Sequence, residues 1–119
     1  MKLCMIGTGY VGLVSGTCFA EIGNHVICVD KDGNKIKKLN LGISPIYEPG
    51  LDELIKKNYY SNRLSFTTNI KQAIKLSDII FICVGTPTKK GSLKADLSFV
   101  YKCTKEILKF ANKKKIIVT

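Results

Sequence analysis

The sequence contains few of the residues from which metal sites are built. It has no tryptophan and one histidine, His25, in 119 residues. None of its five cysteines forms a C-x-x-C pair, so the spacing of a zinc site is missing and we expect no bound metal. Each cysteine lies in an apolar stretch, and their odd number argues against a disulfide framework. We therefore predict buried, reduced thiols and a reducing, cytoplasmic compartment; the cysteines are Cys4, Cys18, Cys28, Cys83 and Cys103.

Acidic residues and arginine are also scarce. Nine Asp and Glu oppose nineteen Lys and Arg, which gives a formal net charge of +10, and Arg63 is the single arginine. A nucleic-acid surface is one interpretation, but proteins that recognise bases and phosphates favour arginine for its bidentate fork. The lysines are scattered, and no aromatic residues alternate with them to stack on bases. We interpret the charge as a solvated surface that attracts anionic ligands, and we expect no nucleic-acid partner.

Long apolar runs are missing as well. No uninterrupted stretch reaches the length of about 18 residues that suggests a membrane-spanning helix. The first twenty residues superficially resemble a signal peptide, but Gly7, Gly9, Gly12, Gly16 and Glu21 interrupt the pattern. We therefore expect a soluble protein with no membrane partner.

Short apolar runs alternate with longer stretches of helical spacing. The runs predict strands at residues 2–6, 26–30, 64–67, 78–84 and 115–119. The stretches predict helices at 10–22, 32–41, 51–58, 69–76 and 96–110. Asp32, Asn69 and Asp96 are the expected N-caps of three of these helices. In the first helix, the apolar positions at helical spacing are Val11, Val14, Cys18 and Ile22.

This order of elements indicates the fold class. Apolar strands separated by helices are typical of a parallel sheet covered on both faces. Right-handed crossovers make a doubly wound, Rossmann-type α/β fold the simplest topology. We predict one domain over residues 1–119 and, because a strand with no following helix ends the sequence, a chain truncated from a longer one.

Gly7, Gly9 and Gly12 form a G-x-G-x-x-G motif in the context that a dinucleotide site requires. The motif follows a predicted strand and opens a predicted helix, and Asp30 ends the next strand 18 residues beyond Gly12. Gly7 would permit the tight turn, Gly9 the approach of a pyrophosphate, and Gly12 close packing of the helix on the strand. Asp30 would accept hydrogen bonds from the adenosine ribose and disfavour a 2′-phosphate, which predicts NAD rather than NADP. The alternative is that the glycines only make a turn and that Asp30 is a surface acid.

A second glycine-containing loop follows the fourth predicted strand. Val84, Gly85, Thr86 and Pro87 lie at the carboxyl end of that strand, where ligands bind in open α/β sheets. Gly85 would allow close approach and Thr86 would offer a hydroxyl. From position alone, this loop is as consistent with a plain turn as with a cofactor contact.

The residues resemble a known family, the UDP-glucose dehydrogenases, within the wider group of nucleotide-sugar dehydrogenases. The resemblance runs across essentially the whole chain. Its opening, from Ile6 to Val14, is similar to the family's IGxGYVGL start. The segment from Pro45 to Leu51 resembles PIYEPGL, and Val84 to Pro87 resembles the VGTP loop. The second and third segments, in this order and spacing, are more specific than G-x-G-x-x-G.

The resemblance implies an activity and a set of cofactor contacts. Members oxidise UDP-glucose to UDP-glucuronate with two NAD, through a thiohemiacetal and a thioester on a cysteine. By position, the resemblance implies NAD contacts at Tyr10, Val11, Asp30, Lys35 and Thr86, beside the glycines of the two loops. Glu48 lies in a family segment, but its position assigns it no role.

The chain ends before the family's catalytic cysteine, so we assign no catalytic residue. The resemblance implies that the central and C-terminal substrate domains are missing, that they bind the UDP-sugar, and that the full-length enzyme is a homo-oligomer in nucleotide-sugar metabolism and polysaccharide biosynthesis. We expect the 119 residues to bind NAD weakly and to be inactive alone. The alternatives are a GDP-mannose or UDP-N-acetylmannosamine dehydrogenase, or a stand-alone nucleotide-sensing module.

Overall fold

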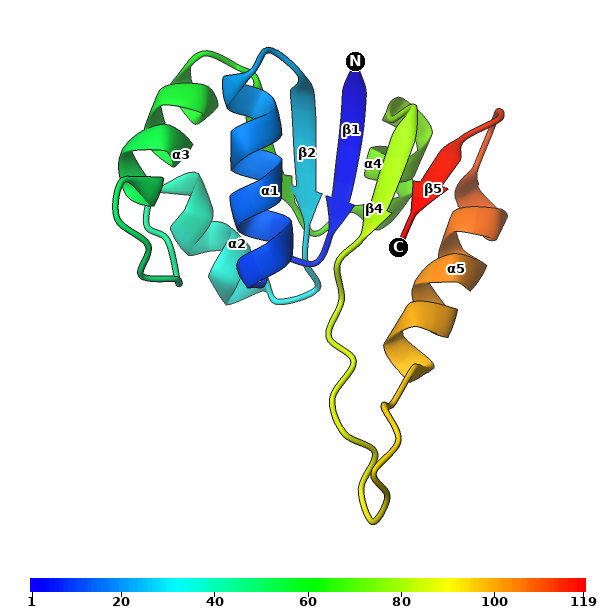
Figure 1. Ribbon diagram of the computed structural model, residues 1–119. Coiled ribbons are helices and arrows are strands. Elements are labelled where there is room, and N and C mark those ends of the chain that lie inside the picture. The colour runs from blue at the N-terminus through cyan, green and yellow to red at the C-terminus, as the bar shows by residue number, and fades with distance from the viewer.

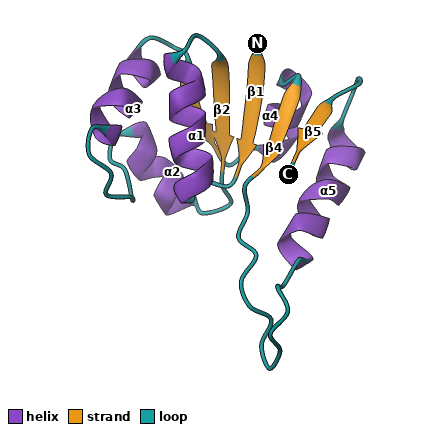
Figure 2. Cartoon of the chain, viewed as in Figure 1, coloured by secondary structure: helices purple, strands orange, loops and turns teal.

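The computed structural model describes residues 1–119 as one parallel sheet with helices on both faces (Figure 1; Figure 2). The strands lie in the order β3-β2-β1-β4-β5, all parallel. The strands are β1 (Lys2–Ile6), β2 (His25–Val29), β3 (Leu64–Thr67), β4 (Ile79–Ile82) and β5 (Ile116–Val118). The helices are α1 (Tyr10–Glu21), α2 (Gly33–Asn40), α3 (Leu51–Tyr60), α4 (Ile70–Leu76) and α5 (Ser98–Phe110). The predicted doubly wound α/β fold is confirmed.

Two apolar cores lie on opposite faces of the sheet. One joins α1, α2 and α3 to the sheet through residues such as Leu13, Leu39 and Ile55, all fully buried. The other joins α4 and α5 to the sheet through Ile74 and Ile107. The long connection from β4 to α5 is an extended loop that projects away from the body of the domain (Figure 1).

The first helix buries little of the predicted face, of which only Val14 is half-buried against the core. Val11, Cys18 and Ile22 are exposed, whereas Gly12, Leu13, Gly16, Thr17 and Ala20 are buried. The reason is close packing: a Cβ on Gly16 would lie 3.0 Å from Cys28 Sγ. A helix that approaches its sheet so closely needs small residues at the points of contact, and Leu13 is the one large apolar residue of α1 that is fully buried.

Two other predictions need correction. Cys18 is exposed and Cys83 is half-buried, so only Cys4, Cys28 and Cys103 are the buried thiols that we expected. Burial raises the pKa of the Cys4 thiol to about 12. The fourth strand spans only Ile79–Ile82. β5 lies at the edge of the sheet, where it pairs with β4 alone, and all three of its residues are exposed.

The predicted helix caps are correct at two of three positions. Asp32 accepts hydrogen bonds from the N–H groups of Asn34 and Lys35, and Asn69 accepts one from Gln72. Asp96 lies one residue too early, because α5 begins at Ser98 with Leu97 as its N-cap. The Asp96 carboxylate accepts a hydrogen bond from the Ser98 N–H. None of the five helices is long and apolar enough to cross a membrane.

Candidate cofactor-binding site

The loop between β1 and α1 requires glycine at two of its three motif positions. Gly7 has φ +105°, and a Cβ there would lie 2.7 Å from the carbonyl oxygen of Cys83 at the end of β4. A Cβ on Gly12 would lie 1.9 Å from the carbonyl oxygen of Gly7. The expected tight turn and close helix packing are therefore both present.

Gly9 differs from these two glycines because nothing in the chain occupies its side-chain position. No atom lies within 4 Å of the place where its Cβ would be. It is the N-cap of α1 and provides no side-chain cap, and α1 has no acidic residue in its first turn. The first N–H groups of a helix lack intrahelical partners and carry partial positive charge, so an anion fits at this open position.

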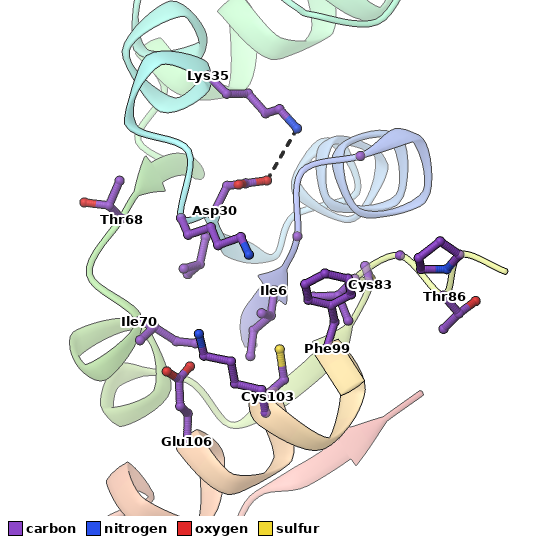
Figure 3. A pocket seen from close by; sticks show the side chains of 18 residues that line it. Ile6, Asp30, Lys35, Thr68, Ile70, Cys83, Thr86, Phe99, Cys103 and Glu106 are labelled. Carbon is purple, nitrogen blue, oxygen red and sulfur yellow. Dashed lines mark ion pairs between the residues drawn. The ribbon is translucent and has the colours of Figure 1, made fainter. Parts of the chain in front are cut away.

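Asp30 follows β2 and is fixed by the loop beside it. Its Oδ2 accepts hydrogen bonds from the hydroxyl of Thr8 at 2.7 Å and from the Thr8 N–H at 3.0 Å. Its Oδ1 accepts one from the Asp32 N–H at 3.0 Å. The ammonium of Lys35 lies 3.6 Å from Oδ2, as the dashed line in Figure 3 marks.

These contacts keep the Asp30 carboxylate ionised. Partial burial is the largest single influence and acts to raise the pKa of Asp30. The hydrogen bonds from Asp32 and Thr8, together with the charge of Lys35, outweigh it and hold that pKa below its usual value. A fixed negative charge therefore lies at the C-terminal edge of the sheet.

A cleft of about 730 Å³ opens at this edge, between the ends of β1, β2 and β4 and the start of α5 (Figure 3). Among the predicted site residues, six line it: Gly7, Gly9, Asp30, Lys35, Gly85 and Thr86. Three do not. Gly12 is buried behind the loop, while Tyr10 and Val11 are exposed outside the cleft.

The side chain of Tyr10 makes a hydrogen bond that could not be expected from its position in the glycine motif. Its hydroxyl donates to Oε2 of Glu48 at 3.1 Å, which connects the start of α1 to the segment before α3. This hydrogen bond gives Glu48 a structural contact beside the site.

The prediction from sequence missed several residues of the cleft. Thr8 has no solvent exposure and contacts Asp30 directly. Phe99 and Cys103 form part of the cleft wall on α5, and the Lys31 ammonium lies 4.9 Å from the centre of the Phe99 ring. The i, i+4 spacing of Phe99 and Cys103 indicated an inward helix face, but nothing in the sequence linked that face to Asp30.

No group of three His, Cys, Asp or Glu residues could hold a metal ion.

The geometry agrees with comparisons to known proteins. The sequence model of the "UDP-glucose/GDP-mannose dehydrogenase family, NAD binding domain" matches residues 1–119, the whole chain. The chain belongs to this family. It is an NAD-binding domain, and NAD fits the open Gly9, the free start of α1 and the ionised Asp30.

Relatives within the UDP-glucose/GDP-mannose dehydrogenase family are similar over almost the whole chain. A UDP-glucose 6-dehydrogenase of Rhizobium meliloti is 56% identical over 90% of this chain. The UDP-glucose 6-dehydrogenase TuaD of Bacillus subtilis is 56% identical over 98% of this chain. A crystal structure of a ternary complex of GDP-mannose dehydrogenase from Pseudomonas aeruginosa has 44% identity and a TM-score of 0.86; the match covers 90% of this chain and 24% of that one. The UDP-N-acetyl-mannosamine dehydrogenase Cap5O of Staphylococcus aureus has 34% identity and a TM-score of 0.89; the match covers 98% of this chain and 27% of that one. The chain spans about a quarter of the length of the curated relatives, 24% and 25%.

Proposed function

We propose that this domain serves a UDP-glucose 6-dehydrogenase, which oxidises the C6 hydroxymethyl of UDP-glucose to the carboxylate of UDP-glucuronate with two NAD. The observation that carries the proposal is the 56% identity to two relatives of that name. The GDP-mannose and UDP-N-acetyl-mannosamine dehydrogenases of known structure are 44% and 34% identical. In this proposal, parts of the enzyme beyond the 119 residues bind the UDP-sugar and supply the catalytic residues.

The proposal assigns cofactor contacts along the cleft. The pyrophosphate lies against Gly9, where the free N–H groups of α1 donate to it. The carboxylate of Asp30 accepts a hydrogen bond from the adenosine ribose and repels a 2′-phosphate, with Lys35 beside it. Gly85 and Thr86 lie nearer the nicotinamide end, because they follow β4. When bound, NAD supplies the hydride acceptor.

The other motif residues support these contacts. Gly7 and Gly12 allow the tight loop that brings Gly9 to the edge of the sheet. Tyr10 and Val11 form an exposed rim at the start of α1, beside the cleft. Their side chains would contact the cofactor from outside the wall that the other residues form.

The proposal extends to location and assembly. The three buried thiols, Cys4, Cys28 and Cys103, and the free state of all five cysteines agree with a reducing, cytoplasmic compartment. From the family resemblance we also propose that the enzyme is a homo-oligomer and makes UDP-glucuronate for polysaccharide biosynthesis. We propose no nucleic-acid or membrane partner.

Calorimetric titration with NAD and NADP tests the cofactor assignment. We expect the chain to bind NAD with preference over NADP, and Asp30→Ala to weaken NAD binding. The absence of NAD binding to a folded chain would overturn the assignment.

A substrate comparison tests the activity. The full-length enzyme should reduce two NAD for each UDP-glucose, measured by NADH absorbance, whereas the 119 residues alone should show no turnover. Preference for GDP-mannose or UDP-N-acetylmannosamine would replace the proposed substrate. Binding of NAD without oxidation of any sugar nucleotide would favour a sensing module.

A further inference from the structure

Thr8 directs its side chain to a carboxylate rather than to the backbone. The other fully buried threonine, Thr17, donates its hydroxyl to the carbonyl oxygen of Leu13 within its own helix. Thr8 instead donates both its hydroxyl and its N–H to Oδ2 of Asp30, 22 residues away in the chain. A buried hydroxyl needs a partner, and here the partner is the charged group of the cofactor cleft.

The two oxygens of Asp30 are therefore not equivalent. A carboxylate offers about four lone-pair positions, two on each oxygen. On Oδ2, the two donors of Thr8 fill both positions, and Lys35 lies at 3.6 Å as well. On Oδ1, the single donor is the Asp32 N–H. One position on Oδ1 is left for a ligand.

We propose that Thr8 is a positioning residue that restricts Asp30 to one accepting oxygen, so that Asp30 contacts one ribose hydroxyl of NAD and Lys35 contacts the other. The inference rests on the proposed site and deepens it. The Lys35 ammonium has three donors and makes one ion pair, so it can donate to a ribose oxygen. Held by Thr8, the carboxylate and the ammonium compensate each other, which favours an uncharged ribose over one with a 2′-phosphate.

A pair of variants separates the hydroxyl from the shape of Thr8. Thr8→Val keeps the volume and removes the donor, while Thr8→Ser keeps the donor. We expect Thr8→Val to weaken NAD binding about tenfold, the size of one hydrogen bond to a charged group, and NADP binding by less than about threefold. Thr8→Val removes the shorter of the two bonds that Thr8 makes to Oδ2, so Asp30 is held less firmly and Lys35 is freer to contact a 2′-phosphate. Thr8→Ser should bind both nucleotides like the wild type.

Equal losses for NAD and NADP in Thr8→Val, or no loss, would overturn the inference. Thermal unfolding of each variant shows whether it is folded. If the unchanged chain binds no NAD, the proposed cofactor site itself fails; if it binds NAD and the selectivity of Thr8→Val is unchanged, only the role of Thr8 fails.

A second measurement needs no change at Thr8. NAD analogues that lack the 2′- or the 3′-hydroxyl of the adenosine ribose are titrated into the wild type and into Lys35→Met. In the wild type, both analogues should bind more weakly than NAD. In Lys35→Met, only one deletion should still weaken binding, because the other hydroxyl has already lost its partner. If both deletions still weaken binding to Lys35→Met, Asp30 accepts with both oxygens and the inference is wrong.

Discussion

The hydroxyl of Tyr10 donates a hydrogen bond to the carboxylate of Glu48 across 38 residues of sequence. Tyr10 begins α1, and Glu48 lies two residues before Gly50, the N-cap of α3. The contact therefore joins the dinucleotide loop to the segment that precedes α3, although both side chains are exposed.

This contact predicts an altered titration of one tyrosine. The hydrogen bond to Glu48, with its negative charge, raises the pKa of the Tyr10 phenol above its usual value. Glu48→Gln removes the charge, so we expect the pKa of Tyr10 to fall toward that of an ordinary tyrosine. Titration of ¹³C-labelled tyrosine by NMR measures it, with Tyr10→Phe used to assign the signal. An unchanged Tyr10 titration in Glu48→Gln would show that the hydrogen bond does not persist in solution.

Asn58 predicts a loss of stability without a loss of cofactor binding. Its fully buried side chain donates to Oε2 of Glu21 at 2.7 Å and accepts from Nε of Arg63 at 3.1 Å. Asn58→Ala leaves both charged partners without this bond, and we expect the free energy of unfolding to fall by about 2 kcal/mol. Urea denaturation measures this loss.

The matched control for Asn58 is Lys57→Ala. Lys57 also contacts Glu21, but its side chain is 60% exposed, so we expect a much smaller change in stability. NAD affinity should be unchanged in both variants, since Asn58 and Lys57 do not line the cleft. A stability loss for Lys57→Ala as large as that for Asn58→Ala would contradict this account.

The strands and the sheet type were predictable because they depend on local patterns. Each buried strand is a short apolar run, and right-handed crossovers restrict the topologies that such runs can form. The face of α1 was not predictable in this way. Counting large apolar residues favoured the face of Val11, Val14, Cys18 and Ile22. Close packing on β1 and β2 instead places small residues such as Gly16 against the sheet, together with Leu13.

The candidate site was predictable where glycine and an acid sit at motif spacing, as with Gly7, Gly9 and Asp30. Thr8 was not, because its hydrogen bond to Asp30 depends on the pairing of β1 with β2, which brings Ile6 beside Val29. That alignment is a property of the whole sheet. The residue between two motif glycines carries no signal of its own.

The ionised state of Asp30 predicts how stability depends on acid. Its pKa in the folded chain lies below the value in an unfolded chain. The stabilisation is therefore fully present above the unfolded value, near pH 4, and is lost as the pH falls through the folded value. Asp30→Asn should be less stable than the wild type at neutral pH and should lose stability less steeply as the pH falls below about 4. Thermal unfolding at a series of pH values measures both slopes, and identical slopes would contradict the prediction.

Gly9 and Gly12 belong to one motif, yet substitution by alanine should affect different properties at the two positions: stability at Gly12 and NAD affinity at Gly9. At Gly12 the new Cβ meets the carbonyl oxygen of Gly7 at 1.9 Å, so the helix or the loop must move. We expect Gly12→Ala to lower the free energy of unfolding by about 3 kcal/mol. At Gly9 the Cβ meets no atom of the chain, and φ is −72°, which alanine adopts readily. Gly9→Ala should therefore change stability by less than about 1 kcal/mol.

The methyl group of Gly9→Ala would instead occupy the space that the pyrophosphate needs. We expect the affinity for NAD to fall by about tenfold or more, equivalent to about 1.4 kcal/mol, while the melting temperature without NAD stays close to that of the wild type. Calorimetric titration and thermal unfolding of the same samples provide the two values. Normal NAD binding by Gly9→Ala would place the pyrophosphate elsewhere, because no rearrangement of the chain is needed to accommodate the methyl group. Loss of binding together with loss of stability would instead mean that the loop had been disrupted, and that Gly9 serves the fold rather than the ligand.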